Sequence, residues 1–202
     1  MRLSLLALSA ALILQPAFAD NISDLQKYLA DTKTLAASFN QVVRNKNGKQ
    51  EQSSGQFALQ RPGKFKWSYS KPYQQDIISN GQSVWLYDID LAQVTIKPIG
   101  KALDASPAAI LTGSNNLAAS YQLQNLPSRG GAEWVALTPK SKDGSFAQIR
   151  LGMVKGQLER MELDDHFNQT TTISLQQIQR NGGLNPAQFT FTPPAGTDII
   201  RE

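Results

Sequence analysis

The chain has 202 residues, no cysteine, one histidine and a formal net charge of +4 at neutral pH. Without cysteine it has no disulfide framework and no Cys–His catalytic pair, and one histidine leaves too few ligands for a closed zinc site. A chain of this length can bury a sufficient hydrophobic core without disulfides. The basic residues are scattered rather than gathered in a stripe with interleaved aromatic residues, so we do not expect nucleic-acid binding.

Residues 1–19 have the features of a secretory signal peptide. Arg2 supplies the positive start, Leu3 to Leu14 form the apolar stretch, and Ala17-Phe18-Ala19 fits the cleavage site. The apolar stretch is about a dozen residues long, whereas a membrane-spanning helix needs about 20. We therefore expect an exported protein whose mature chain, residues 20–202, begins at Asp20 and forms one domain.

The mature chain begins with a predicted amphipathic helix from Asn21 to about Asn45. Its apolar residues recur at helical spacing: Ile22, Leu25, Tyr28, Leu29, Leu35, Phe39 and Val42/Val43. Gly48 ends this pattern and opens a β-rich region.

Eleven segments rich in aromatic and β-branched residues, each bounded by turn residues, predict strands. They are Gln52–Gln60, Lys64–Ser70, Gln74–Ser79, Ser83–Asp88, Gln93–Pro98, Ala119–Leu126, Glu133–Pro139, Phe146–Met153, Gln157–Asp164, Thr170–Ile178 and Phe189–Thr192. Links such as Asn80-Gly81 and Lys155-Gly156 favour tight reversals, so consecutive strands should be antiparallel.

A short apolar helix is predicted between the two groups of strands. Ser106 suits its N-cap, Pro107 its first turn and Gly113 its end, with Ala108 to Leu111 between them. A sheet of about eleven strands is too wide to stay flat, and we expect it to curl around the helical segments as an incomplete barrel.

One face of this curled sheet should be apolar. Phe57 and Leu59 share one face of their strand, and Phe65, Trp67 and Tyr69 share one face of the next. The opposite face of that second strand carries Lys64, Lys66 and Ser68. The alternation alone favours a packed core over ligand contact, although the two interpretations overlap where an empty cavity is filled by its own lid.

The sequence offers little to catalysis. His166 follows Asp164 and Asp165, which indicates a solvated turn rather than a metal site. A nucleophile elbow of the Gly-x-Ser-x-Gly type and a phosphate-binding glycine loop are both missing. Carboxylates brought together only by the fold, as in glycoside hydrolysis, remain open. We expect no enzyme activity, no cofactor and no bound metal.

Several motifs, in this order, carry a family resemblance. They are Phe39-Asn40-Gln41, Arg61-Pro62-Gly63-Lys64-Phe65-Lys66-Trp67, Ile77-Ile78-Ser79-Asn80-Gly81, Val84-Trp85-Leu86-Tyr87, Gln93-Val94-Thr95, Pro107-Ala108-Ala109-Ile110-Leu111 and Phe189 to Gly196. Together they resemble the LolA family of periplasmic outer-membrane lipoprotein carriers, over essentially the whole mature chain.

The resemblance implies a half-barrel with a lid of short helices over an apolar cavity. It further implies a monomeric periplasmic chaperone that takes lipoproteins from an ATP-driven inner-membrane complex and passes them to an outer-membrane acceptor. By the same resemblance, Arg61 matches the residue that holds the lid closed, and Ser106 to Thr112 match the lid helix. The residues expected at the acyl-chain cavity and its lid are Phe39, Phe57, Leu59, Phe65, Trp67, Tyr69, Ile110 and Leu111.

Other functions stay open at this stage. The same half-barrel could carry a free lipid or a glycolipid, and a hydrolase with dispersed carboxylates is a further possibility. The outer-membrane acceptor shares the fold, but it would be anchored through an acylated N-terminal cysteine, which this chain lacks.

Overall fold

The computed structural model describes residues 20–100, 107–112, 116–141 and 144–202. The predicted signal peptide and the predicted cap residues Ser106 and Gly113 lie outside these ranges. The described helices are α1 (Asn21–Asp31), α3 (Pro107–Thr112), α4 (Leu117–Ser120) and the 3-10 helix η1 (Pro186–Phe189). No described helix is long and apolar enough to cross a membrane.

Twelve strands in the described residues form one sheet. They are β1 (Thr34–Arg44), β2 (Gln50–Gln60), β3 (Lys64–Lys71), β4 (Gln75–Asn80), β5 (Ser83–Asp88), β6 (Gln93–Pro98), β7 (Tyr121–Arg129), β8 (Ala132–Pro139), β9 (Phe146–Val154), β10 (Gln157–Asp165), β11 (Thr170–Arg180) and β12 (Asp198–Arg201). The strand order is β12-β6-β5-β4-β3-β2-β1-β11-β10-β9-β8-β7, which places β1 near the middle.

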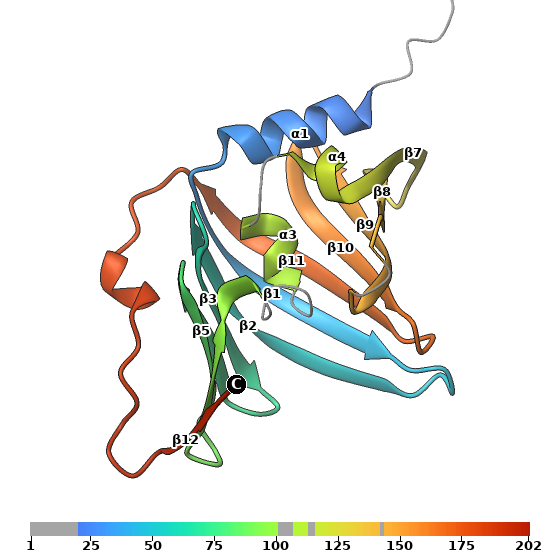
Figure 1. Ribbon diagram of the computed structural model, residues 1–202. Coiled ribbons are helices and arrows are strands. Elements are labelled where there is room, and N and C mark those ends of the chain that lie inside the picture. The colour runs from blue at the N-terminus through green and yellow to red at the C-terminus, as the bar shows by residue number, and fades with distance from the viewer. Residues whose placement is uncertain (1–19, 101–106, 113–115, 142–143) are drawn as a thin grey trace, which may run out of the picture.

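The sheet curls into an open half-barrel, as expected from its width. Figure 1 shows α3 inside the concave side and α1 across one end of the sheet. α1 packs against β7, β8 and β10, and α3 packs against β2 and β3. Both helices therefore cover the face toward which the strands direct their apolar residues.

The predicted helix from Asn21 to Asn45 is wrong beyond Asp31. Thr32 has an extended backbone, and its hydroxyl donates a hydrogen bond of 2.6 Å to the Tyr28 carbonyl oxygen. The chain then continues as β1, in which Leu35, Ala37 and Phe39 alternate with less buried residues. β1 pairs in antiparallel fashion with β2 and with β11.

Asn181 fixes the link between α1 and β1. It has a positive φ of 58° at the end of β11. Its side-chain oxygen accepts a hydrogen bond of 2.8 Å from the Lys33 N–H, and its side-chain nitrogen donates one of 2.8 Å to the Asp31 carbonyl oxygen. One side chain thus satisfies backbone groups where the helix ends and the strand begins.

The C-terminal segment covers part of the convex face. The predicted strand Phe189–Thr192 is wrong, because Pro186 to Phe189 form η1 and residues 190–197 form no strand. η1 packs against β3 and β4, and the Phe191 ring lies 5.1 Å from that of Tyr87 between centroids. β12, which is not among the predicted strands, then pairs parallel with β6.

The other ten predicted strands are confirmed, with ends that differ by a few residues. β7 begins at Tyr121 rather than Ala119 because Leu117 to Ser120 form α4. Gly81, Lys155 and Gly156 have positive φ values of 93°, 48° and 77°, as the predicted tight reversals require.

Candidate functional site

The concave face holds a cluster of aromatic side chains from three neighbouring strands. Trp67 on β3 lies at its centre, 4.6 Å from Phe39 on β1 and 4.7 Å from Phe57 on β2 between ring centroids. Tyr69 meets Phe39 edge-on at 5.2 Å. Aromatic rings prefer such tilted and edge-on contacts. The four rings form a broad apolar surface, and apolar contacts do not require a fixed orientation of the group that packs on them.

Gly55 makes the close packing of β2 and β3 possible. It lies opposite Phe39 in the β1–β2 register, beside a register shift in the β2–β3 pairing. A Cβ at this position would overlap the Ser68 carbonyl oxygen and lie 3.0 Å from the Phe39 ring. Only glycine lets the backbone of β3 and the ring of Phe39 both approach this closely.

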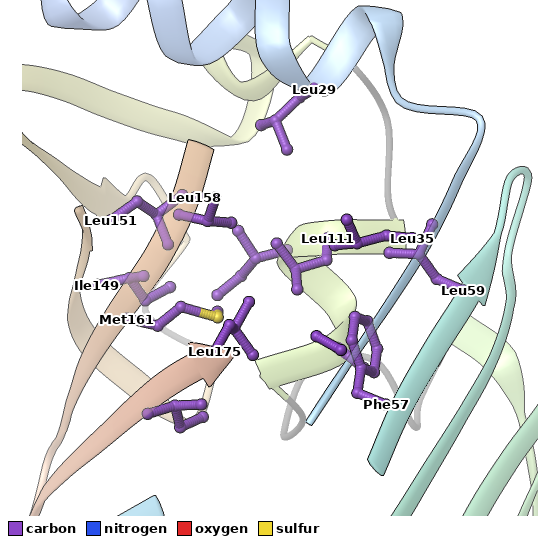
Figure 2. Packing of buried hydrophobic residues seen from close by; sticks show 14 of the residues in the cluster. Leu29, Leu35, Phe57, Leu59, Leu111, Ile149, Leu151, Leu158, Met161 and Leu175 are labelled. Carbon is purple, nitrogen blue, oxygen red and sulfur yellow. The ribbon is translucent and has the colours of Figure 1, made fainter. Parts of the chain in front are cut away.

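Strands β8 to β11 provide the opposite wall, which is aliphatic rather than aromatic. Its residues belong to the same buried cluster as Trp67: Val135, Leu137, Ile149, Leu151, Met153, Leu158, Met161, Leu163, Ile173 and Leu175. Figure 2 shows Ile149, Leu151, Met161 and Leu175 converging on the interior from this side. Sequence reasoning named none of them as site residues, although Ile149, Leu151 and Met153 alternate along β9 as a dry face requires.

α3 fills the space between the two walls. Ala108, Ile110 and Leu111 are buried in the same cluster as the wall residues. Figure 2 shows Leu111 reaching toward Leu35 and Leu59. The Thr112 hydroxyl donates a hydrogen bond of 2.8 Å to the Ala108 carbonyl oxygen, so the one polar side chain described in the helix is satisfied within it.

The structure brings together all eight residues predicted for the cavity and lid. Tyr69 is partly buried against the same cluster. The other seven are no more than 4% exposed: Phe39, Phe57, Leu59, Phe65, Trp67, Ile110 and Leu111. Phe39 belongs to a strand rather than to the predicted helix.

Arg61 begins the turn between β2 and β3, at the end of the sheet near α1. Its backbone N–H donates a hydrogen bond of 2.9 Å to the Lys33 carbonyl oxygen. The side chain is half-buried, and burial lowers the pKa of its guanidinium. An arginine remains protonated at neutral pH even so, which keeps a positive charge at the margin of an apolar interior.

The described residues contain no group of three or more His, Cys, Asp or Glu side chains placed to hold a metal ion. His166 is exposed in the β10–β11 turn, with Nε2 3.1 Å from the Gly144 carbonyl oxygen. The buried cluster itself carries apolar groups, suited to binding hydrocarbon and not to acid–base chemistry.

The sequence profile described as "Outer membrane lipoprotein carrier protein LolA" matches residues 30–192. The chain belongs to the LolA family. Curated relatives named outer-membrane lipoprotein carrier protein include one from Chromobacterium violaceum, 45% identical over 95% of this chain and 92% of that protein. Another, from Nitrosomonas europaea, is 41% identical over 99% of this chain and 98% of that protein.

Solved structures agree on the fold. A conserved protein from Thermus thermophilus, described as uncharacterized, superposes with a TM-score of 0.56 at 16% identity, covering 90% of this chain and 96% of that one. A LolA superfamily protein from Nitrosomonas europaea gives a TM-score of 0.50 at 12% identity, covering 84% and 97%. At such low identities the likeness concerns the LolA-type half-barrel alone.

Proposed function

We propose that this LolA-family protein is a periplasmic chaperone that shields the acyl chains of lipoproteins in the apolar interior of its half-barrel. The observation that carries the proposal is the position of α3, a short apolar helix buried against a continuous apolar concave face. The family match and the names of the curated relatives point to the same role.

The energetics favour exchange between helix and lipid. Burial of one aliphatic side chain stabilises by about 1.5–3 kcal/mol, so Ile110 and Leu111 together contribute about 3–6 kcal/mol. One buried acyl methylene is worth about 0.8 kcal/mol, so about four to eight methylenes offset the loss of both side chains. A long acyl chain exceeds that number and can displace α3 from the interior.

In this scheme the protein alternates between a closed state, with α3 inside, and a lipid-filled state with α3 displaced. Phe39, Phe57, Leu59, Phe65, Trp67 and Tyr69 line the vacated space. Arg61 acts as the latch that favours the closed state, and lipid shifts the balance because it binds only the open one.

The cargo route follows from the family role. Export by the signal peptide places the mature chain in the periplasm as a monomer. There it receives lipoproteins from an ATP-driven release complex in the inner membrane and delivers them to an acceptor on the outer membrane. No catalysis and no cofactor are part of this role.

Depletion of the protein in its source organism tests the role directly. We expect lipoproteins destined for the outer membrane to accumulate at the inner membrane, as membrane fractionation would show. Normal sorting after depletion would refute lipoprotein carriage. Native mass spectrometry of the protein purified from its own periplasm would then show whether a free lipid or a glycolipid copurifies, which is the alternative role on the same half-barrel.

The latch is tested with Arg61→Leu and, as a matched control, Arg201→Leu on the exposed strand β12. Loss of the latch weakens the closed state, so Arg61→Leu should retain bound lipoprotein longer and deliver less of it to the acceptor. The measurement is the fraction of radiolabelled lipoprotein transferred over time. Loading, retention and delivery equal to wild type would show that Arg61 is no latch.

A further inference from the structure

Trp67, at the centre of the aromatic cluster, carries a polar atom that the cluster does not pair. Its side chain is buried, and Nε1 has no hydrogen-bond partner among the described residues. The other fully buried tryptophan, Trp134 on β8, donates a hydrogen bond of 3.1 Å from its Nε1 to the Arg129 carbonyl oxygen. Buried polar side chains are nearly always paired in this way, so the unpaired N–H of Trp67 calls for an explanation.

The surroundings of Trp67 within the sheet show why it lacks a partner. The rings of Phe39 and Phe57 lie 4.6 and 4.7 Å from its ring between centroids. The Tyr69 hydroxyl, on the same strand, donates a hydrogen bond of 3.2 Å to the Gln41 side-chain oxygen. Burial raises the pKa of Tyr69, and the Gln41 and Trp67 side chains act against that effect. The Trp67 N–H therefore lies near the Tyr69 hydroxyl without forming a hydrogen bond with it.

α3, which packs against β2 and β3, does not supply an acceptor either. Its described side chains are apolar apart from Thr112, whose hydroxyl is bound to the Ala108 carbonyl oxygen. Ile110 and Leu111 belong to the same buried cluster as Trp67, and aliphatic groups cannot accept a hydrogen bond. The closed state thus carries the cost of a buried unpaired donor. That cost is removed if the group that replaces α3 brings an acceptor.

An ester-linked acyl chain brings such an acceptor. The chain begins at a carbonyl, whose oxygen accepts hydrogen bonds, and the ester has no N–H or O–H of its own. Burial of that carbonyl among hydrocarbon groups is unfavourable unless a donor meets it. An unpaired donor in the protein and an unpaired acceptor on the ligand are complementary, because one hydrogen bond between them removes the cost of leaving each unpaired.

Building on the proposed carrier function, we infer that the Trp67 indole N–H donates a hydrogen bond to the carbonyl oxygen of an ester-linked acyl chain once α3 leaves the interior. This hydrogen bond exists only in the lipid-filled state, so it favours loading over the closed state. It also makes the interior selective for acyl chains over hydrocarbon chains that lack a carbonyl. The rest of the chain is held by apolar contact, which leaves its length and path free.

The experiment compares two synthetic probes on the mature wild-type chain. One is a glyceryl cysteine methyl amide that carries two palmitoyl chains in ester linkage. The other carries two hexadecyl chains in ether linkage and lacks both ester carbonyls. Dissociation constants are measured by competition against a fluorescent apolar dye, with the affinity of the dye itself determined for each variant. We expect the ester probe to bind about fivefold tighter, as one net hydrogen bond would give.

Trp67→Phe locates that preference, because it keeps an aromatic ring and removes the N–H. The preference of the wild type divided by that of the variant cancels the difference in hydrophobicity between the probes, and this ratio should be about fivefold. Trp85→Phe on β5 is the matched control, since the Trp85 ring lies 6.4 Å from that of Phe191 between centroids, in the segment that covers the convex face. It should keep the wild-type preference.

A second measurement uses the wild type and does not depend on how well a variant folds. The chain has three tryptophans, and each gives an indole N–H signal in a proton–nitrogen NMR correlation spectrum of the labelled protein. The Trp67 signal should move farther downfield with the ester probe than with the ether probe. The signal of Trp134, whose N–H is already hydrogen-bonded, should respond equally to both probes.

Two failures are distinguishable. A preference as large in Trp67→Phe as in the wild type, or a Trp67 signal at the same position with both probes, would overturn the hydrogen bond and leave the carrier function standing. Failure of the wild type to bind either probe would instead contradict the carrier function itself.

Discussion

Glu162 on β10 is the focus of the ionic contacts on the convex face. It accepts hydrogen bonds of 2.9 and 2.6 Å from the Arg129 guanidinium and one of 2.8 Å from Arg150 Nε. Arg150 also donates a hydrogen bond of 2.7 Å to Asp164. Burial raises the pKa of Glu162, but these charged hydrogen bonds more than offset it and hold the pKa below its usual value.

The lowered pKa of Glu162 predicts how the stability of the fold depends on pH. A carboxylate whose pKa is lower in the folded state stabilises that state above its unfolded pKa, and this contribution is lost as pH falls through the folded pKa. Glu162→Gln should therefore lower the free energy of unfolding at pH 7, and the difference from wild type should shrink below about pH 4.5. Urea unfolding at pH 7 and at pH 3 measures it.

The matched control is Glu133→Gln, at an exposed position on β8. It should change stability little at either pH. A Glu162→Gln effect that is the same at both pH values would show that the carboxylate charge is not what stabilises the convex face.

Among the site residues, sequence alone could predict those of β2 and β3, because Phe57, Leu59, Phe65 and Trp67 alternate in strands bounded by clear turns. Phe39 was placed correctly in the interior but on the wrong element. It lies four residues after Leu35, and a spacing of four puts two residues on one face of a helix and of a strand alike. The opposite wall could not be assigned to the site, because its position depends on how far the sheet curls.

At the scale of whole elements, prediction failed where the apolar spacing of a strand also fitted a helix, or where the strand was very short. β1 follows almost directly on a helix, and its alternation of Leu35, Ala37 and Phe39 is blurred because Ala36, on the other face, is also apolar. β12 has four residues and is defined by its parallel partner β6, which no local pattern shows. Phe189 and Phe191 do alternate, but both pack on the sheet from outside, and Pro193 and Pro194 cannot donate to a ladder.

The proposed function requires α3 to leave the interior while the sheet stays folded. Leu111→Ala should weaken only the closed state, so deuterium exchange at the α3 amides should speed up. Because lipid competes with α3 for the same space, the apparent affinity for an acylated ligand should rise by about tenfold for each 1.4 kcal/mol lost from the closed state.

Leu151→Ala on β9 is the comparison for this variant, since Leu151 is equally buried but belongs to the wall. It should lower the global free energy of unfolding by about 2–5 kcal/mol and change deuterium exchange at the α3 amides less than Leu111→Ala does. Weaker lipid binding by Leu111→Ala would show that the helix contributes to the lipid site and does not compete with it.

On the scale of the whole molecule, both faces of the sheet are covered at β3. α3 packs on the concave face of β2 and β3, and η1 packs on the convex face of β3 and β4, with Phe189 1% exposed. Ile78 and Val94 are buried outside the concave cluster, on strands that this segment adjoins. The C-terminal segment is therefore part of the hydrophobic structure.

Phe189→Ala tests this covering. Removal of a fully buried aromatic side chain should lower the free energy of unfolding by about 3–5 kcal/mol. Phe167→Ala in the β10–β11 turn removes a side chain that is 81% exposed, and it should change stability by no more than about 0.5 kcal/mol. Similar effects of the two substitutions in a denaturant titration would contradict the role given to the C-terminal segment.

The central strand β1 pairs with its next neighbour β2 on one side and with β11 on the other, where Phe39 lies opposite Leu175. The second pairing joins residues more than a hundred positions apart, and pairings of such long range form slowly because a large loop must close first. Strands β1 to β6 can assemble by local hairpins, but their apolar face stays open to water until β11 docks. For a newly made chain, the surface that would later hold lipid is thus the one most exposed to aggregation, and the last pairing protects it.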